Sequence, residues 1–142
     1  MPNFTVDKKD IKKIPCSGEC DFNDESVIFS PDAKQLVVSR NLPTGNENLF
    51  LVDIATGNTR VLTTGFLDIR GVDWHPFKDQ LVFSAVEQDE RRGYFYNFDT
   101  QTVTDMKVKG LSYPEFSAQG DVYFHQWHID SALMRIKVND PI

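Results

Sequence analysis

Residues 29–39 (FSPDAKQLVVS) decide how this chain folds. An aromatic residue, Phe29, ends one apolar segment, four turn-forming residues follow, and a second apolar segment begins at Gln35. In such a turn Pro31 presets φ, and the side chain of Asp32 bonds back to the backbone. The stretch therefore predicts two antiparallel strands, over 25–29 and 35–39, joined by a tight turn.

The same pattern recurs twice along the chain, at 74–84 (WHPFKDQLVFS) and at 116–124 (FSAQGDVYF). The aromatic anchors Phe29, Trp74 and Phe116 are 45 and then 42 residues apart. Because large aromatic side chains at one phase of a repeat bury surface between units, we expect all three to lie buried between neighbouring units.

A second marker repeats at the same period. Apolar segments end on Asp7, Asp53 and Asp99, which are 46 residues apart, and residues 134–137 (MRIK) occupy the same place a fourth time without the aspartate. Repetition favours a structural role, in which each carboxylate bonds the turn that follows its strand.

Each unit consists of short, alternating segments rich in Val, Ile, Phe and Tyr, and no segment has a sustained helical period. Within the first unit the strands are predicted over 25–29, 35–39, 49–53 and 59–62. Four antiparallel strands repeated every ~40–50 residues are typical of a β-propeller. The sequence therefore predicts one all-β domain with outer strands in 1–20, a blade in 21–64, a second in 65–110 and an incomplete third in 111–142.

About three blades cannot close a ring with ordinary geometry, because closed propellers have four to eight. The third predicted blade also lacks its outer strand, and an open edge invites strand addition. The N-terminal strands could fill that gap in the same chain or in another. Two interpretations follow: a partial propeller that contacts further blades, or a homodimer that forms a six-bladed ring.

Residues 29–40 and 48–57, closed by Leu62 and Thr63, resemble the TolB-type, WD-like propeller repeat. The third copy departs from it, because Ala118 and Gln119 replace the Pro-Asp pair, although Gly120 is retained. Such repeats occur in TolB, in the propellers of prolyl-oligopeptidase-like peptidases and in the sensory half of ToxR-like or CadC-like bacterial regulators.

Residues 72–76 (VDWHP) and 123–127 (YFHQW) are most similar to the regulator group. The resemblance implies the sensory part of a membrane-associated bacterial transcriptional regulator, located in the periplasm. The propeller portion of a peptidase, or a TolB-like envelope protein, is the alternative reading, and a cytoplasmic location is the alternative to the periplasm.

The overall charge and composition exclude some classes of binding partner. The formal net charge is −6, which argues against direct contact with nucleic acid or anionic membrane surfaces. No stretch approaches the ~20 apolar residues of a membrane span, and residues 1–4 do not begin a signal peptide. A protein partner or an unknown small ligand is therefore expected.

The sequence predicts a protein that is not an enzyme and carries no cofactor. It contains no Gly-x-Ser-x-Gly elbow, and its two cysteines, Cys16 and Cys20, have no further ligand at a zinc-site spacing. A local disulfide and two free thiols both stay open for that pair.

The histidines are the remaining candidates for a site. His75 takes the serine position of a Ser-Pro-Asp turn, where a turn-capping or surface role is expected. His125 and His128 flank Trp127 in a predicted loop with Asp130. An aromatic-lined interaction loop or plain packing suits a loop between strands better than a metal site. The predicted binding residues are therefore His75, His125, Trp127 and His128, with no metal and no catalytic residue.

Overall fold

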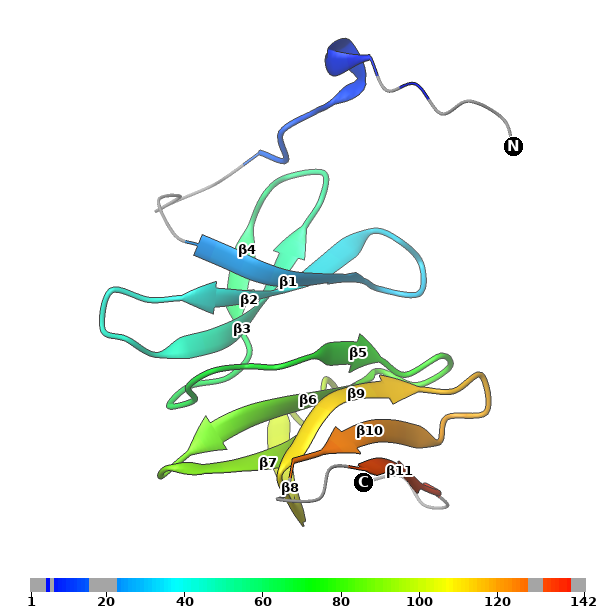
Figure 1. The fold of residues 1–142 in the computed structure, drawn as a ribbon. Coiled ribbons are helices and arrows are strands. Elements are labelled where there is room, and N and C mark those ends of the chain that lie inside the picture. The colour runs from blue at the N-terminus through cyan, green and yellow to red at the C-terminus, as the bar shows by residue number, and fades with distance from the viewer. Residues whose placement is uncertain (1–4, 6, 16–22, 128–131, 139–142) are drawn as a thin grey trace.

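The computed structural model describes residues 5, 7–15, 23–127 and 132–138. These residues form three antiparallel sheets, which we call blades 1 to 3 (Figure 1). Blade 1 contains β1 (Asn23–Phe29), β2 (Gln35–Asn41), β3 (Glu47–Asp53) and β4 (Thr59–Val61). Blade 2 contains β5 (Val72–Trp74), β6 (Gln80–Glu87), β7 (Glu90–Asn97) and β8 (Thr102–Lys109). Blade 3 contains β9 (Leu111–Phe116), β10 (Val122–Gln126) and β11 (Ala132–Ile136). The all-β prediction of about three blades is confirmed.

The turn between β1 and β2 forms as the sequence predicts. The Ser30 hydroxyl donates to the Asp32 carboxylate at 2.7 Å and accepts from the backbone N–H of Gln35 at 3.0 Å. Asp32 also accepts from the backbone N–H of Lys34. These bonds satisfy backbone donors that the tight turn would otherwise leave unpaired.

The turns after the third strands show one correction. Asp53 accepts from the backbone N–H of Thr56 at 2.9 Å, as predicted. In blade 2 the acceptor is Asn97, which bonds the backbone N–H groups of Asp99 and Thr100. The prediction for Asp99 was wrong, because Asn97 and not Asp99 ends β7 at the position that Asp53 has in β3.

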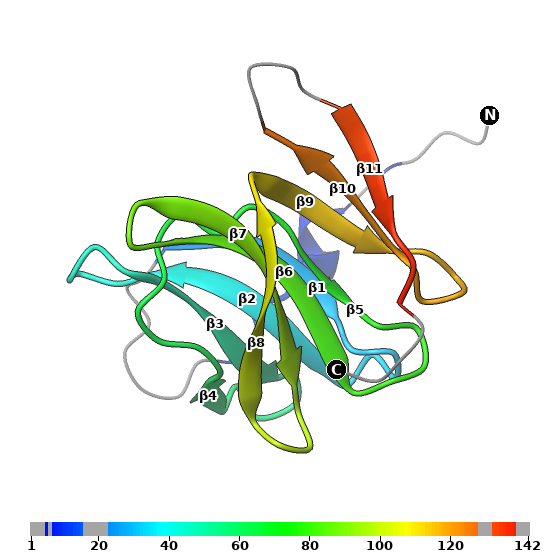
Figure 2. The ribbon, with the colours of Figure 1, turned by 90° about the horizontal axis from the view of Figure 1, so that it is seen from below.

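The blades pack face to face, and Figure 2 looks along the stack. Their first strands meet in succession, with β1 against β5 and β5 against β9. Two apolar layers separate the blades. The layer between blades 1 and 2 includes Val37, Leu49, Leu51, Trp74, Leu81, Phe83 and Tyr94. The layer between blades 2 and 3 includes Val82, Phe95, Leu111, Val122 and Phe124.

The three aromatic anchors differ in burial. Trp74 is 9% exposed and packs between blades 1 and 2, and Phe116 is half-buried between blades 2 and 3. Phe29 is 62% exposed, so the prediction that it is buried was wrong. The reason is its position: it lies on the face of blade 1 that points away from blade 2, where the described residues place no further sheet.

The described N-terminal residues, Thr5 and 7–15, contain the 3-10 turn η1 (Lys8–Asp10) and no strand, in contrast to the outer strands expected in 1–20. Cys16 and Cys20 lie outside the described residues, so their pairing stays a prediction. No helix in the described ranges is long and apolar enough to cross a membrane.

Candidate interaction site

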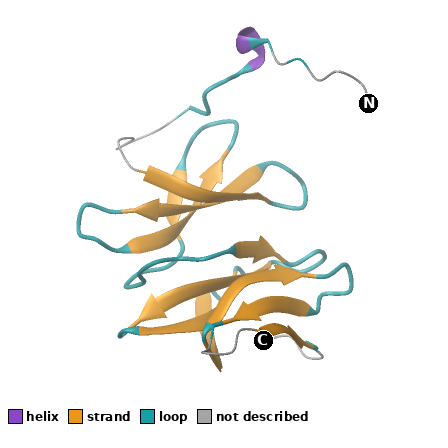
Figure 3. Ribbon diagram, viewed as in Figure 1, coloured by secondary structure: helices purple, strands orange, loops and turns teal. Residues whose placement is uncertain are grey.

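The strand connections divide each blade into two ends (Figure 3). The turn end carries the turns β1–β2, β5–β6 and β9–β10. The link end carries the turns β2–β3 and β6–β7 and the link 62–71 between blades 1 and 2. His75 lies at the turn end, whereas His125 and Trp127 lie at the link end. The structure therefore does not bring these predicted binding residues together, and His128 is outside the described residues.

His75 is an internal part of the β5–β6 turn. Its side chain is 2% exposed, and its Nδ1 accepts from the backbone N–H groups of Phe77 and Lys78 at 3.2 and 3.1 Å. The ring also meets the edge of Phe116 in blade 3 at 4.7 Å. Burial, with a smaller contribution from the charge of Lys78, lowers the pKa of His75. The neutral ring thus caps the turn and packs between blades, while its role in binding stays a prediction.

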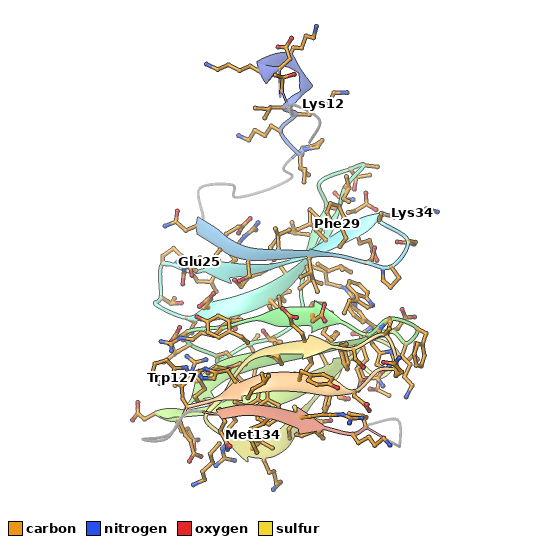
Figure 4. All side chains as sticks on the ribbon, turned by 45° about the vertical axis from the view of Figure 1, so that its right-hand side comes forward. Lys12, Glu25, Phe29, Lys34, Trp127 and Met134 are labelled. Atoms are coloured by element: carbon orange, nitrogen blue, oxygen red, sulfur yellow. The ribbon has the colours of Figure 1, made fainter. Side chains whose placement is uncertain are left out.

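His125 and Trp127 form an aromatic pair at the end of β10. Their ring centroids are 5.8 Å apart in an edge-to-face arrangement, and the indole is more than half exposed. Figure 4 shows Trp127 on the same side of the stack as Glu25, opposite Phe29. The backbone N–H of Trp127 donates to the carbonyl of Gly110 at 2.8 Å. A Cβ at Gly110 would lie 2.4 Å from the Trp127 carbonyl oxygen, so only glycine permits this approach.

Tyr113 adds a second exposed aromatic side chain to the link end. It adopts φ +50°, which is uncommon for a residue with a side chain, and its backbone N–H donates to the carbonyl of Arg70 at 2.9 Å. The register of β9 and β10 shifts here, and the next residue is the buried Pro114. Proline within a strand often marks a bulge, so Pro114 is the signal that could have identified this position from the sequence.

A cluster of charged residues lies next to Tyr113, whose backbone N–H bonds the carbonyl of Arg70. Asp68 accepts from Arg91 at 2.5 Å and pairs with Arg70 at 2.9 Å, so one carboxylate serves two guanidinium groups. Arg91 also donates to the Ser84 hydroxyl at 2.8 Å, and Ser84 donates to the carbonyl of Leu111 at 2.6 Å. Burial lowers the pKa of Arg91, an effect that the charge of Asp68 opposes. Arg91 thus joins Asp68 of the link to Ser84 of blade 2, and Ser84 in turn bonds Leu111 of blade 3.

Glu47 bonds the backbone of the link 62–71, which carries Asp68 and Arg70 of this cluster. Its side chain is buried, and Oε2 accepts from the backbone N–H of Ile69 at 2.8 Å. Burial raises the pKa of Glu47, since the charged carboxylate loses water. A buried acid that bonds the link in this way fixes the loop carrying Asp68 and Arg70.

The link end presents aromatic rings and an arginine side chain to solvent. Exposed aromatic rings supply apolar contact and faces for cations, and a guanidinium donates hydrogen bonds to carboxylates in a bidentate fashion. Among the described residues, no group of three or more His, Cys, Asp or Glu side chains is arranged to hold a metal ion. The sequence-based prediction named His125 and Trp127, which stay predictions, and did not name Arg70, Arg91 and Tyr113, which come from three other segments.

Several solved protein structures superpose on this chain. A putative TolB from Agrobacterium tumefaciens superposes with a TM-score of 0.69 at 18% identity, over 77% of this chain and 40% of that protein. TolB from Acinetobacter baumannii superposes with a TM-score of 0.71 at 19% identity, over 84% of this chain and 31% of that protein. Over the residues that superpose, this chain has the β-propeller fold of these two proteins.

A third solved structure also superposes on this chain. An auxiliary nutrient binding protein from Bacteroides thetaiotaomicron has a TM-score of 0.58 at 17% identity, over 79% of this chain and 28% of that protein. The chain thus spans well under half the length of each of these propeller proteins. No family model matches the sequence, and no curated protein matches it.

Proposed function

We propose that this propeller is a non-catalytic module that binds a protein partner at its link end, through Trp127, Tyr113 and Arg70. The observation that carries the proposal is the presence of two exposed aromatic side chains, Tyr113 and Trp127, at the end of the stack that also carries Arg70 and its partner Asp68. Trp, Tyr and Arg are the residues most enriched among those that dominate binding energy at protein interfaces. The uncommon backbone of Tyr113 supports the same reading, because such conformations gather at functional sites.

The partner that fits this surface is an acidic segment with aromatic or aliphatic side chains. Arg91 is almost buried and is already bonded by Ser84 and Asp68, whereas the Arg70 side chain is 38% exposed, so Arg70 is the group that a carboxylate of the partner would contact. The chain has a net charge of −6, and Glu87, Asp89 and Glu90 lie at the same end, so the partner carboxylate would bind at Arg70 itself and not on a broadly positive surface.

The proposed setting is the sensory part of a membrane-associated bacterial transcriptional regulator in the periplasm. The resemblance of 72–76 and 123–127 to that group supports it, and the second of these segments contains Trp127. The structural likeness to two TolB proteins favours a TolB-like envelope protein as the second candidate. The sequence that flanks this chain in its gene distinguishes the two candidates. A winged-helix segment and one membrane span upstream would support the regulator.

A peptide array tests the binding mode. We expect the purified chain to bind acidic, aromatic-containing peptides and to ignore the same peptides with Glu and Asp replaced by Lys. Trp127→Ala and Arg70→Ala should each abolish the signal, whereas the matched exposed aromatic variant Phe77→Ala at the turn end should retain it. Equal binding of acidic and basic peptides, or binding indifferent to both link-end variants, would contradict the proposal.

A further inference from the structure

We propose that Asp68 is a built-in competitor for Arg70: its carboxylate occupies the Arg70 guanidinium until a carboxylate of the partner displaces it. The inference rests on the proposed function, in which Arg70 contacts the partner, and it adds the residue that sets the affinity of that contact. The link 62–71 carries both residues. It holds Asp68 in place and leaves the Arg70 side chain facing solvent.

One peptide group of the link is held from both sides. The backbone carbonyl of Asp68 accepts from Nη2 of Arg91 at 2.8 Å. The N–H of the same peptide group belongs to Ile69, and it donates to Oε2 of Glu47 at 2.8 Å. Glu47 begins β3 in blade 1, and Arg91 is the second residue of β7 in blade 2. Each neighbouring blade therefore fixes one side of this peptide group.

The backbone of Asp68 has an uncommon conformation that these two bonds maintain. Its φ is +44°, in the left-handed region that few residues with a side chain adopt, although aspartate is enriched there. Such conformations persist only where the surrounding structure determines them. The bonds from Glu47 and Arg91 supply that constraint, so the direction in which the Asp68 side chain leaves the link is fixed.

The Asp68 carboxylate is held from the interior by Arg91. Nη2 of Arg91 lies 2.5 Å from Oδ2 of Asp68, and Nη1 donates to the Ser84 hydroxyl at 2.8 Å. The Arg91 side chain is only 11% exposed, whereas that of Asp68 is half exposed. Because a partly buried ion pair is only weakly screened by salt, this pair keeps Asp68 in place when the Arg70 side chain moves.

Arg70 binds the same carboxylate from the solvent side. Its Nε donates to Oδ1 of Asp68 at 3.2 Å, and its Nη2 lies 2.9 Å from Oδ2. Asp68 thus fills one of the edges through which a guanidinium binds a carboxylate by two hydrogen bonds. An ion pair that faces solvent contributes little to stability, since both ions are well solvated when apart. A partner carboxylate that aromatic contacts shield from water can therefore displace Asp68 from Arg70.

Displacement leaves no charge without a partner. Asp68 stays paired with Arg91, and Arg70 gains the carboxylate of the partner in exchange. Burial is the main cause that lowers the pKa of Arg91, and the charge of Arg70 lowers it further, so the two guanidinium groups repel each other. Movement of the Arg70 side chain toward a partner relieves this repulsion. Asp68 therefore reduces the affinity of the site without blocking it.

Titration calorimetry with a defined acidic peptide tests the proposal. The probe is a capped pentapeptide of alternating Glu and Trp, and its counterpart with Lys in place of Glu reports non-specific binding. Asp68→Asn keeps an oxygen that accepts from Arg91 but carries no charge to hold Arg70. We expect this variant to bind the acidic peptide about fivefold more tightly than the unaltered chain, since no exposed ion pair has to be broken.

The matched control is Asp89→Asn, at an exposed aspartate in the β6–β7 turn at the same end of the stack. It removes the same charge from a residue whose backbone is also left-handed, with φ +62°, and it leaves the carboxylate that Arg70 binds. Its affinity for the acidic peptide should stay within about twofold of the unaltered chain, because exposed charges are screened by salt.

A second measurement reports the ion pair itself and needs no partner. The Nε–Hε NMR signal of Arg70 should exchange with water more slowly in the unaltered chain than in Asp68→Asn, because Asp68 accepts that hydrogen bond. Equal exchange rates would overturn the competitor role. Peptide binding with equal affinity for both proteins would overturn the competitor role alone, whereas no binding to either protein would overturn the proposed function and the competitor role with it.

Discussion

The carboxylate of Asp73 in blade 2 accepts the backbone N–H of Phe116 in blade 3, with 2.7 Å between Oδ2 and N. The other oxygen, Oδ1, accepts the backbone N–H of Trp74 at 2.9 Å. One side chain thus satisfies two donors on the first strands of adjacent blades. Among the described residues, the outer edge of each of these first strands has no neighbouring strand to bond it. The Asp73 carboxylate therefore joins the two blades by hydrogen bonds to backbone N–H groups that no ladder pairs.

Loss of this bond should destabilise the junction. We expect Asp73→Ala to lower the free energy of unfolding by about 1–3 kcal/mol, because two partly buried N–H groups lose their acceptor. Asp73→Asn keeps an acceptor oxygen and should cost less. Urea denaturation followed by tryptophan fluorescence measures both. Asp79→Ala, at an exposed aspartate in the next turn, should stay within about 0.5 kcal/mol of the unaltered chain.

Gly65 and Gly71 both lie in the link 62–71 between blades 1 and 2. Substituting them allows the cost of backbone strain to be measured separately from the cost of a steric clash. Gly65 has φ +82° with open space around it, whereas Gly71 has φ +87° and would place a Cβ 2.7 Å from the Cα of Tyr113. We expect Gly65→Ala to cost about 1–2 kcal/mol from its backbone conformation alone. Gly71→Ala should cost clearly more and should also shift Tyr113. Equal melting temperatures for the two variants would show that the link does not hold Tyr113 against blade 2.

Burial between blades should decide how strongly each phenylalanine contributes to stability. Phe83 is fully buried between blades 1 and 2, with Phe66 and Tyr94 each 5.4 Å from its ring centre. We expect Phe83→Ala to destabilise the chain by about 3–5 kcal/mol, through lost burial and the cavity left behind. The exposed Phe77 serves as the comparison, and Phe77→Ala should cost about 0.5 kcal/mol or less. Thermal melts of both variants give the answer.

The stability of the chain should depend on pH through Glu47. Burial raises the pKa of this carboxyl above its ordinary value of 4.5, so folding favours the protonated form. Its contribution to stability is therefore complete below that ordinary value and is lost as the pH rises through the raised pKa. Glu47→Gln cannot ionise, so the variant should gain stability relative to the unaltered chain as the pH rises from 4.5 toward neutrality.

Denaturant titrations of both proteins across that pH range measure the difference directly. Other carboxyls, such as Asp121 beside Arg135, have lowered pKa values and titrate identically in the two proteins, so they cancel. A difference for Glu47→Gln that stays constant across this pH range would show that this side chain does not carry its charge into the interior.

Local chemistry explains which features could be predicted. The β1–β2 turn follows from Pro31 and Asp32, and the strands follow from alternation of apolar and polar residues, because both depend on neighbours within a few positions. The repeat period required nothing more than the spacing of such local signals. The shift from Asp99 to Asn97 shows the limit, since two residues of register change which side chain caps a turn.

The sequence by itself determined that the chain forms propeller blades, because strand pairing and turn formation are encoded in short segments. Only the tertiary structure decided that Trp74 is buried and Phe29 exposed, since burial depends on whether another blade packs on that face. It alone placed His75 and Trp127 at opposite ends and brought Arg70 and Arg91 to one carboxylate. Those relationships join residues from different strands and links. Their proximity arises from the stacking of blades, so no regular spacing in the sequence signals it.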